Sequence, residues 1–356
     1  MAVLGNRVSM VDMAKRVDKD GTFVKIAEVL EQSNPILEDM PFYESNAPLS
    51  NRVSFRTGLP EIGFARLNKG IAPSKSNVTS REDTIGWLEG RSEVDRRHAG
   101  RSMTHDNYLK FRWSEDRAFL QAMGHRQAQL LLFGDERYES EAYTGFFPRL
   151  SDVTDPIFGE SVTVAAEKSS GGEKGFDNIL IVDWGEDYCH GIYPFNTPAG
   201  LKKTDHPNEP VKDKDGGTFY ADVSQFEWAM GLTVRHPKHV HRIANIPRSN
   251  FEALYGTSAT IAGNATNLDD LPDLVSYLVH ALGEMDECTN GHRVIYTSKR
   301  IMGALSLMAR NHNNVHLSIG EWAGKRVTEF WGIPIRKLDV LDKVIDEGIN
   351  APQTGT

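Results

Sequence analysis

The stretch Val327-Thr-Glu-Phe-Trp-Gly-Ile-Pro-Ile-Arg336 lies near the end of the chain and has the pattern of a strand interrupted at Gly332-Ile-Pro334. Glycine permits dihedral angles that other residues avoid, and proline removes a hydrogen-bond donor from a sheet ladder. These residues therefore predict a bent edge strand at the end of a domain. A short apolar and acidic segment, Val340 to Glu347, follows it.

The length and charge of the chain limit the classes of protein to which it can belong. A chain of 356 residues can bury a sizeable core and suggests about two domains. Its formal net charge of -9 argues against a general binder of nucleic acids or membrane surfaces. Any contact with DNA is therefore expected to be local and independent of base sequence.

Cysteine content and the N-terminus indicate a compartment. Cys189 and Cys288 are too few for a disulfide scaffold and lack the paired spacing of a zinc site, which favours a reducing compartment. The first residues contain no continuous apolar segment typical of a signal peptide, and no run approaches the length that spans a membrane. We expect a soluble protein that is not secreted.

A long polar hairpin is predicted between residues 52 and 101. Alternating residues indicate strands at Arg52–Arg56, at Gly63–Leu67 and from Asn77 to Asp95. A two-stranded hairpin is marginally stable alone, and this one has few apolar residues to bury. It therefore needs a partner surface, which could belong to its own domain or to a neighbouring chain. Removing Gly58 to Arg91 is expected to cost its own core little.

The rest of the chain predicts a mixed sheet flanked by helices. Apolar spacing indicates a helix over residues 113–134 that Ser114 could cap. Further helices are expected within residues 8–32, from a cap at Asp269 or Asp270 to Leu282, and from a cap at Ser298 to Arg310. Strands are expected at residues 178–184, 191–195, 219–223, 231–235, 293–297, 315–319 and 327–335, and residues 202–217 are expected to form a charged excursion.

The densest group of chemically versatile residues is the run from Arg235 to Arg242, which contains three histidines. In a strand, His239 and His241 would share one face and could chelate a metal, with His236 or a distant carboxylate as third ligand. The flanking basic side chains would repel a cation, however. A basic edge that contacts a neighbouring subunit or a phosphate group is therefore favoured over a metal site.

Catalytic motifs are not found in the sequence. It contains no Gly-x-Ser-x-Gly elbow, no Walker loop and no Gly-x-Gly-x-x-Gly after a strand. Its many carboxylates are explained by acidic helix ends and solvated faces. We therefore predict no catalytic, cofactor-binding or metal-binding residues, no cofactor and no enzymatic activity.

Several blocks, taken in order, resemble one protein family. They are Met10 to Val17, Ile26 to Met40, Arg56-Thr-Gly-Leu-Pro60, Trp113-Ser-Glu-Asp-Arg-Ala-Phe119 and the final Gly332-Ile-Pro-Ile-Arg336. Together they are similar to the major capsid proteins of tailed bacteriophages with the Hong Kong 97-like fold, of the podovirus type found in epsilon-fifteen and Bordetella phage.

The resemblance implies an α+β fold with a set order of parts. Residues 1–51 would form an N-terminal arm, and residues 52–101 would form the extended hairpin loop that lies over an adjacent subunit. Residues 102–180 would hold the long spine helix and the peripheral domain. Residues 181–356 would form the axial domain, with strands that return to the peripheral domain. Phe64, Ile85, Trp87 and Arg91 are the candidate contacts between subunits.

The resemblance also implies a function. Pentamers and hexamers of the chain would form the icosahedral head around double-stranded DNA, after assembly in the host bacterial cytoplasm. The implied partners are further copies of the chain, scaffolding, portal and possibly decoration proteins, and packaged DNA through non-specific contacts, without a membrane. No removable scaffolding segment is recognisable, so a separate scaffolding protein is expected. The alternatives are a nanocompartment shell, another virion structural protein, or a metal-dependent enzyme that uses His236, His239 and His241.

Overall fold

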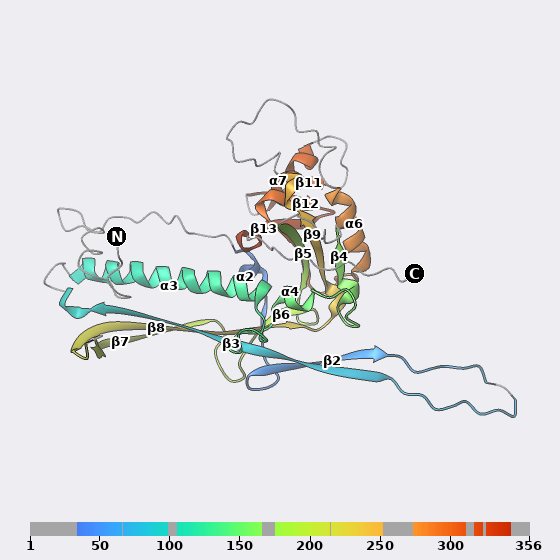
Figure 1. Ribbon diagram of the computed structural model, residues 1–356, viewed down its shortest axis with the longest axis horizontal. Coiled ribbons are helices and arrows are strands. Elements are labelled where there is room, and N and C mark those ends of the chain that lie inside the picture. Colours follow the sequence, from blue (N-terminus) through green and yellow to red (C-terminus); the bar gives the residue numbers. More distant parts are fainter. Residues whose placement is uncertain are drawn as a thin grey trace. The chain divides into compact units, whose positions relative to one another are not determined.

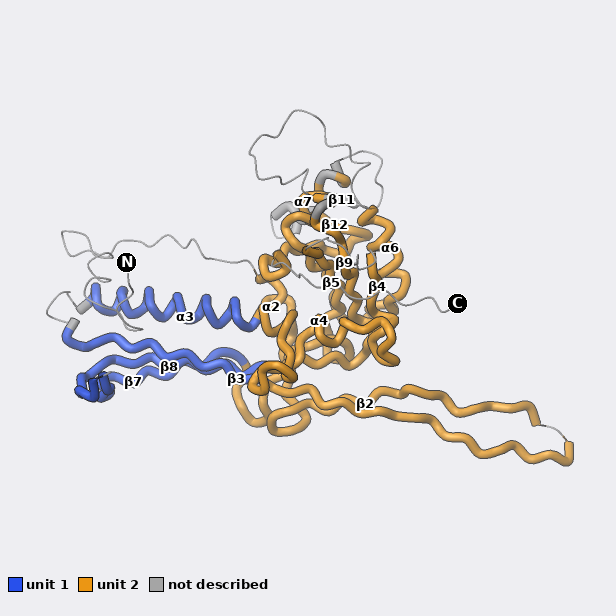
Figure 2. Tube along the Cα trace, in the orientation of Figure 1, with its two compact units in different colours: residues 1–32, 86–127, 200–230 blue, residues 33–85, 128–199, 231–356 orange. Residues whose placement is uncertain are grey.

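The computed structural model describes residues 34–65, 67–98, 105–165, 175–213, 215–251, 273–310, 317–322 and 325–342. The helix expected within residues 8–32 lies outside them. The chain divides into two compact units (Figure 2). The described part of unit 1 falls within Gly86–Gln127 and Gly200–Met230, and that of unit 2 within Ser33–Ile85, Ala128–Ala199 and Gly231–Thr356. The division into four parts implied by the resemblance stays a prediction.

Unit 1 combines one long helix with long strands. Helix α3 spans His105–Phe133 and enters unit 2 at its end, and strand β3 (Asn77–Asp95) belongs to unit 1 from Gly86 onward. Strands β7 (Leu201–Lys212) and β8 (Thr218–Val234) pair antiparallel. The predicted helix start was wrong, because α3 begins at His105 and Ser114 lies inside it. The first turns contain Tyr108 and Phe111, two buried apolar residues at helical spacing that the prediction did not use.

Two expectations for this region were wrong. Residues 202–217 do not form a loop excursion, since most of them belong to β7, and the two short strands predicted at residues 219–223 and 231–235 are parts of the single strand β8. Most side chains of β7 are exposed, and within the strand only Val211 is buried. Its pairing with β8 combines backbone hydrogen bonds with side-chain contacts such as that between Ser224 and Asp205, and its sequence carries no alternation of apolar and polar residues.

Contacts between α3 and the strands hold unit 1 together. The rings of Phe119 and Phe226 stack with their centroids 5.8 Å apart. Lys203 Nζ lies 2.6 Å from a carboxylate oxygen of the buried Asp116. Tyr108 donates a 2.7 Å hydrogen bond to Asp222, and burial followed by this bond raises the pKa of the Tyr108 hydroxyl. One face of α3 is therefore fixed on β7 and β8 by both apolar and polar contacts.

Unit 2 is built around β5 (Phe176–Trp184), all of whose residues are buried. It pairs antiparallel with β9 (Val240–Pro247) and β10 (His292–Thr297). Ile179 and Ile181 pack with apolar residues of α6 (Leu274–Glu284) and α7 (Lys299–Arg310), which Figure 1 shows beside the sheet. The remaining elements are α2 (Ile36–Asp39), β1 (Phe42–Glu44), β2 (Ser50–Gly58), α4 (Phe146–Arg149), β4 (Val162–Val164), β6 (Cys189–Tyr193), β11 (Leu317–Trp322), β12 (Lys325–Phe330) and β13 (Ile333–Lys337).

The helix starts in unit 2 were partly predicted. Ser298 Oγ accepts a hydrogen bond from the Ile301 backbone N–H at 3.4 Å, as expected for the cap of α7. The predicted cap of α6 was wrong. The capping residue is Asp273, whose side chain accepts a hydrogen bond from the Ser276 N–H at 3.1 Å. Asp269 and Asp270 lie outside the described residues.

The stretch from Val327 to Ile335 is a reversal, and not the single bent edge strand that was predicted. Strands β12 and β13 pair antiparallel, and the two residues between them, Trp331 and Gly332, have φ values of 51° and 77°. Two consecutive positive φ values define the tight type I′ hairpin turn. Nor does β13 lie at an edge, since it also pairs parallel with β10 from Ile335 onward. Pro334 lies before the residues of β13 that pair with β10, so its missing N–H removes no donor from that pairing.

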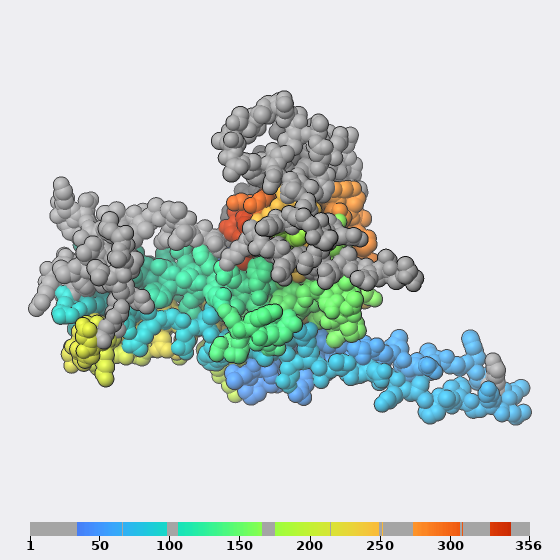
Figure 3. Space-filling model, in the orientation of Figure 1, coloured from blue at the N-terminus to red at the C-terminus, as the bar shows by residue number. Residues whose placement is uncertain are grey.

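The predicted hairpin is present and projects from unit 2. Strand β2 pairs with the first part of β3 from Ser50 opposite Thr84 to Gly58 opposite Asn77, and Figure 3 shows this arm in blue. The third expected strand, at Gly63–Leu67, was wrong. The described residues between Gly58 and Asn77 form a strand-free tip. We refer to residues 59–76 as the hairpin tip.

The root of the hairpin is buried in unit 2. Arg149 Nη1 donates to Asp83 Oδ1 at 2.6 Å, and both side chains are 2% exposed. Its other nitrogens donate to the backbone oxygens of Thr144 and Leu232. The expectation that Gly58 to Arg91 could be removed at little cost was therefore wrong, because the segment contains Asp83, the partner of a buried charge.

We predict that Gly332→Ala lowers the free energy of unfolding by about 1–2 kcal/mol, the cost of placing an L side chain in a left-handed conformation. The measurement is chemical denaturation of the unassembled subunit. Gly63→Ala is the matched control, since Gly63 lies in the tip and an added Cβ would meet nothing within 4 Å. Equal effects of both substitutions would contradict the left-handed conformation assigned to Gly332.

Arg149→Met is expected to lower the free energy of unfolding by about 3–5 kcal/mol, because it leaves Asp83 as an uncompensated buried charge. The control is Arg52→Met in the same hairpin. Arg52 pairs with the neighbouring Glu82, but their side chains are 65% and 52% exposed, and such pairs contribute about 0–1 kcal/mol. Comparable losses in the two variants would show that the root is not held by Arg149.

Candidate assembly surface

The hairpin tip carries large apolar side chains that its own unit leaves uncovered. Ile62 and Phe64 are both 98% exposed, and Leu67 is 97% exposed. Leu59 and Ile71 in the same segment are also exposed. Soluble proteins rarely expose apolar side chains in such a concentration unless another surface covers them. The described tip is thus a candidate surface for binding another molecule.

Local contacts in the tip are few and polar. Ser74 Oγ donates a 2.8 Å hydrogen bond to the Glu61 backbone oxygen, which links the two sides of the tip. Pro60 and Pro73 restrict the backbone on either side. These features extend the chain without building a core, so the apolar groups remain available to a partner.

The structure places the four predicted contact residues in different environments. Phe64 lies in the tip, whereas Ile85 is buried in unit 2 at 9% exposure and has little surface to offer. Trp87 belongs to unit 1 and is 47% exposed. Arg91, also in unit 1, pairs with Glu93 at 2.9 Å and Glu209 at 3.1 Å. Phe64 and Trp87 therefore remain the predicted apolar anchors.

The residues that sequence reasoning missed are the neighbours of Phe64 in the tip, Ile62 and Leu67. A signal for them was present: apolar residues alternate with glycine and charged residues between Pro60 and Pro73. That alternation was interpreted as a strand. In the structure it leaves side chains exposed along an extended segment.

The run from Arg235 to Arg242 was expected to form a basic edge, but it does so only in its first half. Its second half is buried: Arg242 is 4% exposed, donates to Asn178 and lies over the Phe147 ring at 4.0 Å. Burial lowers the pKa of Arg242 to about 9. Only the first part of the run can meet a phosphate.

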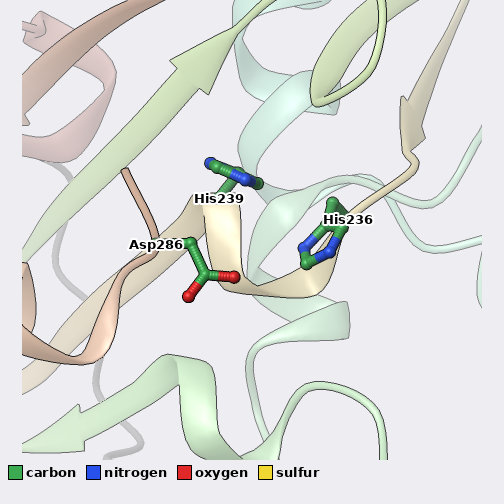
Figure 4. Close-up of side chains that lie close together, drawn as sticks. All are labelled: His236, His239 and Asp286. Atoms are coloured by element: carbon green, nitrogen blue, oxygen red, sulfur yellow. The ribbon is translucent and has the colours of Figure 1, made fainter. Parts of the chain in front are cut away.

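The histidines of this run separate into two sites. His241 in β9 lies 2.8 Å from Thr163 Oγ1, and burial followed by the charge of His280 lowers its pKa to about 4. His239 ends a 3-10 turn before β9 and lies 2.7 Å from Asp183. The disfavoured alternative, a chelating pair of His239 and His241 on one strand face, therefore does not fit the structure. His239 lies instead beside His236 and Asp286 (Figure 4).

Among the described residues, every helix is too short or too polar to cross a bilayer. No curated protein matches this sequence. The family model of major capsid protein GP7 matches residues 18–345. A chain in the near-atomic-resolution cryo-EM structure of bacteriophage epsilon15 is 28% identical with a TM-score of 0.75, and the match covers 98% of each chain.

Two further solved structures are more distant. The capsid of bacteriophage JBD30 is 8% identical with a TM-score of 0.47, and the match covers 87% of this chain and 91% of that one. The SrpI encapsulin of Synechococcus elongatus is 11% identical with a TM-score of 0.42, covering 67% and 97%. Because the family model spans nearly the whole chain, this chain belongs to the major capsid protein GP7 family and is a tailed-phage capsid shell protein with the α+β Hong Kong 97-like fold.

Proposed function

We propose that this chain assembles as pentamers and hexamers into a closed icosahedral head around double-stranded DNA, and that each hairpin tip binds an adjacent copy. The observation that carries the proposal is the exposure of Ile62, Phe64 and Leu67 in a segment without a core. In a shell made of one chain, the surface most available to such a tip is a second copy. We propose no catalytic role for the chain.

The expected strength of the contact fits a shell. Full burial of each large apolar side chain contributes about 1.5–3 kcal/mol, from which the cost of ordering the tip is subtracted. Each contact can therefore be weak by itself. A closed shell repeats it in every subunit, so small interface energies accumulate. An apolar contact also suits a chain of net charge -9, whose copies repel one another.

The partners other than copies of the chain itself are also proposals. We propose that scaffolding and portal proteins, and possibly a decoration protein, act with this chain during assembly in the host bacterial cytoplasm. A nanocompartment shell is not favoured, because the family match is to a phage capsid protein. Nuclease-protected DNA inside purified particles would distinguish a phage head from an empty compartment.

The triple substitution Ile62→Ser, Phe64→Ser and Leu67→Ser should abolish particles while the subunit keeps a cooperative thermal melt, because these side chains contribute nothing to its own core. Electron microscopy and gel filtration with scaffolding protein present are the measurements. The matched control is Leu49→Ser, Tyr138→Ser and Phe195→Ser, three exposed apolar residues of unit 2 outside the tip. Normal assembly of the tip variant, or equal loss in the control, would contradict the role of the tip.

A deletion makes the same test independently. Gly58 and Asn77 are paired residues, so an Asn-Gly link in place of residues 59–76 can close the hairpin as a two-residue turn. This design keeps Asp83 at the hairpin root. An unfolded product would show that the tip belongs to its own core.

Binding of the subunit to double-stranded DNA is expected to be weak and independent of base sequence, and to fall as salt rises. Of the basic run, only Arg235, His236 and Lys238 are exposed. Arg235→Gln with Lys238→Gln should therefore weaken binding by only a few fold and equally for all sequences. Fluorescence anisotropy against salt measures this, and a footprint at one defined target would contradict it.

A further inference from the structure

Three potential metal ligands meet on the surface of unit 2. His236 precedes the short turn Pro237–His239 between β8 and β9, His239 ends that turn, and Asp286 follows helix α6. Figure 4 shows the three side chains gathered over this turn. Their ligand atoms all lie within 4.8 Å of one another. Segments distant in sequence thus bring two imidazoles and a carboxylate together.

His239 is held in the orientation that a metal ligand requires. Its Nδ1 lies 2.7 Å from Oδ2 of the fully buried Asp183, which also accepts two hydrogen bonds from Arg293. The Tyr188 ring packs on the imidazole with centroids 4.0 Å apart. When Nδ1 donates to Asp183, the lone pair is on Nε2. A carboxylate bound to the distal nitrogen of a histidine is the usual support of a histidine that binds metal.

The surrounding charges do not exclude a cation. Arg235 lies 4.0 Å from Asp187, and Lys238 lies 3.8 Å from Glu160, so each has an acidic neighbour. The guanidinium of Arg242 is buried against Phe147 and Asn178.

We propose that His236, His239 and Asp286 bind one divalent transition-metal ion of the zinc class, with water as the remaining ligand. Two imidazole nitrogens and one carboxylate oxygen suit zinc, whereas calcium and magnesium prefer oxygen ligands alone. Metal–ligand distances of about 2.0–2.2 Å place tetrahedral ligands roughly 3.4 Å apart. His236 and Asp286 are exposed and can rotate inward to reach that spacing.

A bound ion would join the turn between β8 and β9 to the segment between α6 and β10, in addition to the described hydrogen bonds. The expectation of no metal site was based on the flanking basic side chains, and the pair considered for chelation was His239 and His241. The structure assigns a different set of ligands, with His239 alone retained from that pair. The proposal does not depend on how the shell assembles.

The test measures zinc in the purified full-length chain. After incubation with micromolar Zn²⁺ and removal of the excess, elemental analysis should find one zinc per chain. Titration with Co²⁺ should produce the intense visible absorption of a four-coordinate site. Mg²⁺ and Ca²⁺ should not compete. A chain without stoichiometric zinc, or equal competition by Mg²⁺, would overturn the proposal.

Substitutions locate the ion. His236→Ala and Asp286→Asn, both at exposed positions, should each weaken Zn²⁺ binding at least tenfold while far-UV circular dichroism stays unchanged. The matched control is His280→Ala, because His280 is an exposed histidine 4.0 Å from Glu284 outside the cluster. Unchanged binding in the first two variants, or an equal loss in the control, would show that the ion binds elsewhere.

Discussion

The buried guanidinium of Arg149 is the contact on which the hairpin depends. It joins Asp83 of β3 to the backbone oxygens of Thr144 and Leu232, three segments that are distant in sequence. Removing a charge from water costs several kcal/mol unless it is paired and fully hydrogen-bonded. These segments must therefore come together, and the hairpin leaves unit 2 from a fixed root. Two strands alone would be only marginally stable.

The two ends of the hairpin use different physical interactions. At the root, hydrogen bonds with defined geometry give direction, as between Asn51 and Thr233 at 3.1 Å. At the tip, Phe64 and its neighbours offer apolar surface, whose burial is favourable without requiring one geometry. A directed arm with an adaptable end suits contacts that recur in slightly different surroundings. Pentamers and hexamers would present such surroundings.

The fold was predictable where burial shaped the sequence. Strands β5 and β10 were predicted because each contains a continuous run of buried apolar residues, and α7 because Ser298 precedes it. Strand β7 was missed, since most of its side chains are exposed and leave no alternating pattern. The reversal between β12 and β13 was missed because a type I′ turn favours Asn-Gly, and here a tryptophan at a positive φ precedes Gly332.

The candidate sites show where the alternation of side chains along a strand no longer predicts their surroundings. Ile85 and Trp87 share one strand face in β3, yet Ile85 is buried in one unit and Trp87 is half-exposed in the other. His239 and His241 have the same spacing, but β9 begins at Val240, so His239 belongs to a turn that starts with Pro237. A period of two predicts a shared face only within one strand in one environment. At the boundary of an element, tertiary contacts decide which residue a side chain meets. His239, for example, pairs with Asp183, which is distant in sequence, so no local sequence pattern could reveal that contact.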